Sequence, residues 1–215
     1  MKHLSNIQDP IYIGYFKIPP EYYQDKIRYF ERNKKKFNLL PEEAFFSLNL
    51  DYIRSLYKVK EYTQFLHYVD KMIEQLILGD QLYNEWKDIY TELLYKKAVA
   101  HYFNMEYQKT EEVLSQLVRI KLKPAYGKLF TKTVRDRLRA RSQNTRGLVI
   151  MLLLMSGLVI AVELLVVRNL FTDQIWWVEF LRNALFIAAI SVYLGLESFI
   201  YFKSRSTLKK AIGKS

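Results

Sequence analysis

Two long apolar stretches dominate the pattern of hydrophobic and polar positions along the chain. They cover residues 147–167 and 176–202, and only eight residues separate them. Each is about as long as the roughly 20 residues that an α-helix needs to cross the hydrocarbon core of a bilayer. Residues 147–162 carry no charge and no amphipathic period, so the whole circumference of such a helix favours lipid or protein over water. The pattern predicts a C-terminal transmembrane hairpin, with a buried soluble helix as the alternative.

The distribution of charge supports the hairpin and suggests its orientation. The net charge is −1 over residues 1–118, +9 over 119–146, −2 over 147–202 and +5 over 203–215. Because positively charged residues next to membrane spans stay on the cytoplasmic side, both flanking segments are expected there. The sequence therefore predicts an inner (cytoplasmic) membrane protein with two spans and with both termini in the cytoplasm.

Aromatic and basic residues mark the ends of the predicted spans. Trp176 and Trp177 open the second span, and Tyr201 and Phe202 close it, as amphipathic rings do at headgroup level. Arginines alternate with other residues at positions 135–141, before the first span. Nucleic acid is not expected as their ligand, because on a helix they point in different directions and no aromatic residues lie between them for base stacking. Contact with an anionic lipid membrane contributes about 1 kcal/mol per basic residue. The residues expected to contact lipid headgroups are Arg135, Arg137, Arg139, Arg141, Arg146, Lys203 and Arg205.

The residues before the hairpin have a helical pattern and are numerous enough for a core of their own. Residues 11–20 are expected to be an irregular, aromatic lead, and no pair of strands competes with an all-α fold. Helices are predicted to start at or next to Pro20, Pro41, Tyr62, Asp80, Tyr107 and Pro124. The expected segments are a lead and first helix (1–40), helical repeats (41–124), a basic juxtamembrane helix (125–146), the transmembrane hairpin (147–202, with spans 147–167 and 176–202) and a basic cytosolic tail (203–215).

An internal repeat is visible in the cytosolic part. Tyr57 and Tyr62 flank a short predicted turn, and Tyr102 and Tyr107 flank another one 45 residues later, each followed by an amphipathic helix. Here the chain resembles the tetratricopeptide-repeat (TPR) family of antiparallel helix pairs. The resemblance covers about residues 41–124. A plain helical bundle is the alternative.

The resemblance to the TPR family is degenerate. Ala98 stands at a small-residue position of that family, and Leu114 and Leu117 at packing positions, but Phe65 and Thr110 stand where the family has alanine. The period of 45 residues is also longer than the usual 34. The resemblance implies a scaffold whose concave face binds another protein. Tyrosines expected to contribute contact area to such a protein partner are Tyr52, Tyr57, Tyr62, Tyr95, Tyr102 and Tyr107.

Glu163 and Arg182 lie at similar depth in the two predicted spans. An unpaired charge near the middle of a bilayer costs about 2.5 to 3.5 kcal/mol, so we expect these two residues to form an ion pair. Glu179 is a competing partner for Arg182. In the functional alternative, Glu163 lines an aqueous path between subunits.

Glu197 is the third acidic residue of interest in the predicted hairpin. It lies near the cytosolic end of the second span, where it can reach the cytosolic surface or meet Arg146 or Lys203. Small residues four positions apart, such as Gly157 and Ala161, allow close helix approach and a homo-oligomer.

The composition gives little support for catalysis. The chain has no cysteine and three histidines, and it contains no phosphate-binding loop, dinucleotide fingerprint or H-E-x-x-H motif. Residues 1–10 are polar, so no cleaved secretory signal is expected. We therefore expect no enzyme activity, no cofactor and no metal.

The features combine into a membrane-anchored, TPR-like scaffold or adaptor that recruits a protein partner to the cytosolic face of the membrane. The alternative is an oligomeric pore-forming or membrane-perturbing effector with a cytosolic helical sensor domain. The two differ in ion conduction and in its dependence on Glu163 and Arg182.

Overall fold

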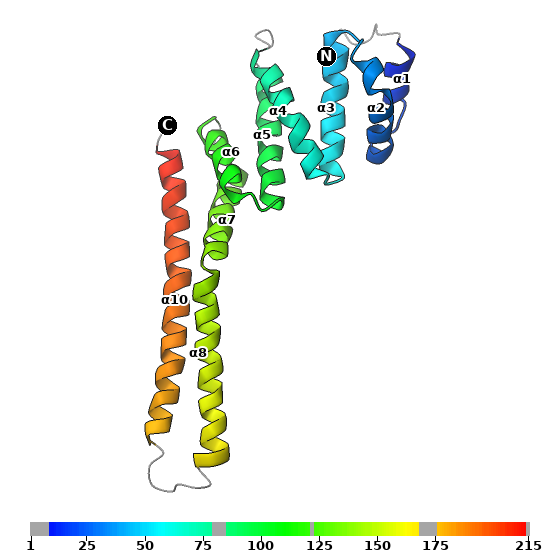
Figure 1. Cartoon of the computed structure of the whole chain (residues 1–215). Helices are drawn as coiled ribbons and strands as arrows, with labels where there is room; N and C mark the ends of the chain where they lie inside the picture. Colours follow the sequence, from blue (N-terminus) through cyan, green and yellow to red (C-terminus); the bar gives the residue numbers. More distant parts are fainter. Residues whose placement is uncertain (1–8, 79–84, 121–122, 168–175, 214–215) are drawn as a thin grey trace. The chain divides into compact units, whose positions relative to one another are not determined.

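The structure, a computed structural model, describes residues 9–78, 85–120, 123–167 and 176–213. Over these residues the chain is all-α, with adjacent antiparallel helices and no strand, as the sequence predicts (Figure 1). The predicted cap at Asp80 and the connection at 168–175 lie outside them. The elements are α1 (Pro10–Phe16), α2 (Tyr23–Phe37), α3 (Glu42–Lys58), α4 (Tyr62–Leu78), α5 (Glu85–Phe103), α6 (Tyr107–Ile120), α7 (Pro124–Arg141), α8 (Gln143–Val162), the π-helical segment η2 (Glu163–Val167) and α10 (Trp176–Ile212).

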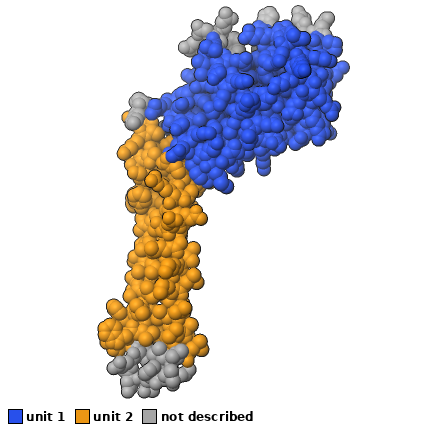
Figure 2. Space-filling model, viewed as in Figure 1, with its two compact units in different colours: residues 1–122 blue, residues 123–215 orange. Residues whose placement is uncertain are grey.

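The chain divides into two compact units (Figure 2). Unit 1 covers residues 1–122 and contains α1 to α6. Unit 2 covers residues 123–215 and contains α7, α8, η2 and α10. Within unit 1 each helix packs against the next one along the chain, and within unit 2 α10 packs against both α7 and α8.

The first helix of unit 1 corrects one prediction. The sequence predicts an irregular lead over residues 11–20, but Pro10–Phe16 is helical. The Asp9 carboxylate caps this helix by accepting hydrogen bonds from the backbone N–H groups of Ile11 (2.7 Å) and Tyr12 (3.2 Å). Pro10 suits the first helical position because its missing N–H has no partner to lose there. The aromatic composition therefore favoured an irregular lead, whereas the Asp9 cap stabilises a helix.

Aromatic packing joins the first helices of unit 1. The Phe30 ring on α2 stacks on the Tyr52 ring on α3, with centroids 4.0 Å apart and an interplanar angle of 13°. Nearby, the Asp51 carboxylate accepts hydrogen bonds from the Tyr15 hydroxyl (3.0 Å) and from the buried Lys26 ammonium (2.8 Å). A buried charge needs such a partner, because an isolated one is costly to desolvate. Residues from α1, α2 and α3 thus share one core.

Unit 2 contains two helices that are long and apolar enough to cross a membrane by length and composition. They cover Gln143–Leu165, with 23 residues, and Trp176–Ile212, with 37 residues. Only 17% and 11% of their most apolar windows are buried within the chain, whereas the core helix of a soluble protein is mostly buried. The segment predicted as a basic tail at 203–215 continues the helix α10 as far as Ile212.

Candidate functional site

The turns between α3 and α4 and between α5 and α6 have the same backbone geometry. Lys60 and Met105 adopt left-handed conformations, with φ values of 66° and 60°. In the first turn the Glu61 N–H donates to the Leu56 carbonyl at 3.0 Å. In the second, the N–H of the equivalent Glu106 donates to a carbonyl five residues earlier at 2.9 Å. Both are helix ends of the type in which a left-handed residue closes the last turn.

The tyrosine pairs that suggested the repeat meet across these turns. The rings of Tyr57 and Tyr62 lie edge to face with centroids 5.9 Å apart and planes at 64°. The rings of Tyr102 and Tyr107 lie 5.9 Å apart at 61°. Phe103 stacks on Tyr62 at 5.2 Å and 5°, which links one turn to the next. The two turns therefore share the arrangement of their aromatic rings as well as their backbone geometry.

Charged residues connect the first helices of the two pairs. Arg54 on α3 donates two hydrogen bonds to Glu92 on α5, at 2.6 and 3.2 Å. Lys96 also donates to Glu92 and lies 5.4 Å from the centre of the Tyr57 ring. Burial acts to raise the pKa of Glu92, but the hydrogen bonds from Arg54 and Lys96 outweigh it and hold the pKa below its ordinary 4.5. An ion pair thus joins α3 to α5.

The tyrosines predicted to bind a partner differ in exposure. Tyr52 lies in the core with 1% of its surface exposed, where it has no area to offer a partner. The other five are half-buried: Tyr57, Tyr62, Tyr95, Tyr102 and Tyr107. Burial, followed by the neighbouring Tyr62 and Tyr95, raises the pKa of Tyr57. The sequence analysis did not select Phe103 and Met105, which lie in the second turn beside these tyrosines and expose 58% and 75% of their surface.

The expected ion pair between Glu163 and Arg182 is present. The Arg182 guanidinium donates to the Glu163 carboxylate at 2.8 Å, and only 1% of the Glu163 side chain is exposed. Glu163 begins the π-helical segment η2, a local widening of the helix that is frequent at functional positions. The competing residue Glu179 is exposed on α10. One acid and one base thus join the two candidate spans.

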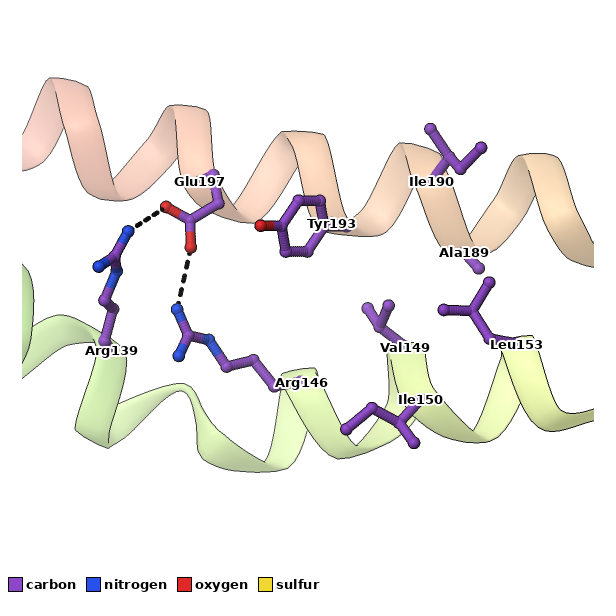
Figure 3. Close-up of a pocket in the computed structure, with 9 residues that line it drawn as sticks. All are labelled: Arg139, Arg146, Val149, Ile150, Leu153, Ala189, Ile190, Tyr193 and Glu197. Carbon is purple, nitrogen blue, oxygen red and sulfur yellow. Dashed lines mark hydrogen bonds and ion pairs between the residues drawn. The ribbon is translucent and has the colours of Figure 1, made fainter.

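Glu197 on α10 joins three helices, near the other end of the predicted second span (Figure 3). Its two carboxylate oxygens accept hydrogen bonds from Arg139 on α7 and from Arg146 on α8, each at 2.9 Å. Arg146 was one of the expected partners, and Arg139 was not. The signal for Arg139 is a spacing of seven residues from Arg146, which places both on one side if the helix continues with little interruption.

The remaining residues predicted to contact lipid are distributed over two helices. Arg135, Arg137 and Arg141 lie on α7, and Lys203 and Arg205 lie on α10. Arg205 also lies over the Tyr201 ring at 4.7 Å. The structure thus brings Arg139 and Arg146 together at one acid and leaves Arg141 and Lys203 exposed to the surroundings.

Comparison of the chain with known protein families, with curated proteins and with solved structures finds no match. Among the residues that the structure describes, no group of three acidic, histidine or cysteine side chains is placed to hold a metal ion. The distinctive features are therefore the repeated aromatic turns of unit 1 and the paired charges of unit 2.

Proposed function

We propose that this protein is a membrane-anchored, TPR-like scaffold that recruits a protein partner to the cytosolic face of the membrane. The observation that carries the proposal is the recurrence, 45 residues apart, of one helix–turn–helix geometry around Lys60 and Met105. Stacked helix pairs of this kind bury a shared core and present extended surfaces to other proteins.

The partner surface of this proposal is the aromatic row along the two turns. It consists of the half-buried tyrosines at 57, 62, 95, 102 and 107 together with the exposed Phe103 and Met105. Aromatic residues and methionine are enriched at protein interfaces, because they provide large contact areas. Tyr52 is left out of this surface because it belongs to the core.

The anchor of the proposal is the helical hairpin of α8, η2 and α10. Large apolar side chains are exposed along both helices, including Leu154, Leu158, Phe186 and Leu194, and lipid would cover them. The excess positive charge at 119–146 and 203–215 supports a hairpin with both flanking segments in the cytoplasm. Unit 1 then lies in the cytosol, where a soluble partner reaches it.

The pairing of Glu163 supports an anchor over a pore. A carboxylate that lines an aqueous path needs contact with water, whereas Glu163 is 1% exposed and engaged with Arg182. In reconstituted liposomes the protein is expected to leave the membrane ion-tight, and the variant with Glu163→Leu and Arg182→Leu is expected to keep its partner. Conduction that disappears in this variant would instead support the pore-forming alternative.

Site-specific photo-crosslinking of the full-length protein in cells tests the partner surface. A photoreactive amino acid placed at Phe103, or in a second variant at Tyr95, should give one discrete crosslinked product. The added mass of the product should be the same for both positions. The matched control is the same amino acid at Gln116, an exposed position on α6 away from the aromatic row. Adducts of equal yield at Gln116, or no protein adduct at Phe103 and Tyr95, would contradict the proposed surface.

A further inference from the structure

A hollow of about 590 Å³ lies along the hairpin beside Glu197 (Figure 3). Its wall changes character along its length. At one end are the guanidinium groups of Arg139 and Arg146, and beyond them the wall is apolar, with Val149, Leu153 and Ile190 among its residues. A hollow that is cationic at one end and apolar at the other matches a ligand with an anionic head and a hydrocarbon chain.

The cationic end has hydrogen-bonding capacity to spare. A guanidinium group carries five N–H donors, and the hydrogen bonds that Arg139 and Arg146 make to Glu197 use only part of this capacity. Both arginine side chains are more than one third exposed. The charged groups that line the hollow are these two guanidinium groups and the Glu197 carboxylate, and Asp136 also acts on Arg139. The site therefore has room for a further anionic acceptor, and guanidinium groups bind phosphate oxygens strongly.

The apolar end has the length of much of one membrane leaflet. From Arg146 to Leu153 a helix rises about 10 Å, against a leaflet hydrocarbon depth of about 15 Å. Ala189 and Ile190 face the same hollow from α10. If the hairpin spans a bilayer, acyl chains surround this apolar wall. An acyl chain that binds in the hollow then stays in an apolar environment.

We propose that this hollow is a specific site for one anionic phospholipid, with the phosphate at Arg139 and Arg146 and an acyl chain along Val149, Leu153 and Ile190. The site differs from the general attraction of basic residues to a negative surface, because it depends on where two arginines lie and on an apolar wall. The inference requires the hairpin to lie in lipid but does not depend on the protein partner of unit 1.

Native mass spectrometry of the full-length protein, purified in detergent with equal amounts of phosphatidylglycerol and phosphatidylcholine, tests the site. The wild type should retain one phosphatidylglycerol in preference to phosphatidylcholine. The triple variant Arg139→Gln, Arg146→Gln, Glu197→Gln removes the three charges together, so that no carboxylate is left without its partners. It should retain at least about fivefold less phosphatidylglycerol than the wild type. The matched control Lys209→Gln, Lys210→Gln removes two exposed charges of α10 that lie outside the hollow, and it should retain lipid within about twofold of the wild type.

A second pair of variants tests the apolar wall without changing charge. Ile190→Trp fills the hollow and should reduce lipid retention, whereas Ile187→Trp adds the same bulk at an exposed position of α10 outside it. Equal loss of bound lipid in the triple variant and in the exposed-charge control would overturn the proposal, since it would show that lipid retention depends on total charge alone. Displacement of the lipid by water-soluble glycerol phosphate at equal concentration, or a dimer that carries no lipid, would also overturn it.

Discussion

Lys60 and Met105 hold the same left-handed backbone conformation at equivalent points of two helix pairs. Their φ values are 66° and 60°, and neither is glycine, the residue that adopts this conformation at least cost. The conformation is kept because the following N–H groups close the preceding helices. The left-handed conformation is thus held by the capping hydrogen bonds, although the residue type at this position disfavours it.

Glycine at these positions should stabilise the protein. Lys60→Gly and Met105→Gly remove a left-handed Cβ, and each is expected to raise the free energy of unfolding of unit 1 by up to about 1 kcal/mol, partly offset by the greater freedom of the unfolded chain. The control Lys71→Gly lies within α4 and should lower it by about 1 kcal/mol. Thermal unfolding of the full-length protein in detergent, followed by circular dichroism, measures the difference. Equal destabilisation by Lys60→Gly and Lys71→Gly would contradict this account of the turn.

Removing one partner of the Glu163–Arg182 pair should be worse than removing both. Arg182→Leu leaves a carboxylate that is 1% exposed without its base, at a cost of about 3 to 5 kcal/mol. The double variant Glu163→Leu, Arg182→Leu should recover most of this loss, because no charge remains to desolvate. Thermal stability in detergent of the two single variants and the double variant gives the coupling. Losses that simply add would show that the two side chains act independently.

Acid should weaken the contact between α3 and α5. The pKa of Glu92 is held below its ordinary 4.5, so the stabilisation is present above that value and is lost as the pH falls through the folded-state pKa. The effect is about 1 kcal/mol or less, because Arg54 and Glu92 are each about one third exposed. Glu92→Gln should flatten the decline of thermal stability below pH 4.5, and the exposed control Glu112→Gln should not. If thermal stability falls with pH as steeply in Glu92→Gln as in the wild type, this ion pair does not contribute to the acid sensitivity.

Much of the helical layout follows from local signals that the sequence contains. Proline at a helix start and apolar spacing of three and four predicted α3 and α7, which begin at Glu42 and Pro124. Tyrosine spacing predicted the two turns, because the same rings meet across each of them. Helix α1 was missed because its cap is a single carboxylate, Asp9, and its seven residues are too few to show a helical period.

Contacts between distant segments followed from the sequence only where one geometric rule was enough. A hairpin places residues at matching depth side by side, which gave the pair of Glu163 and Arg182. The contact of Glu197 with Arg139 also depends on where α7 ends and how α8 follows it at Ser142, and composition does not give this. The stacking of Phe103 on Tyr62 depends in the same way on how the two helix pairs pack.

Cysteine accessibility in intact cells tests the central claim of a membrane hairpin with unit 1 in the cytosol most directly. The chain has no cysteine, so single substitutions Gln116→Cys, Trp176→Cys and Ser206→Cys each report one position. A membrane-impermeant maleimide should label Trp176→Cys, at the outer end of the second span, in intact cells. It should label Gln116→Cys and Ser206→Cys only after the membrane is opened. Labelling of Gln116→Cys from outside intact cells would contradict the account.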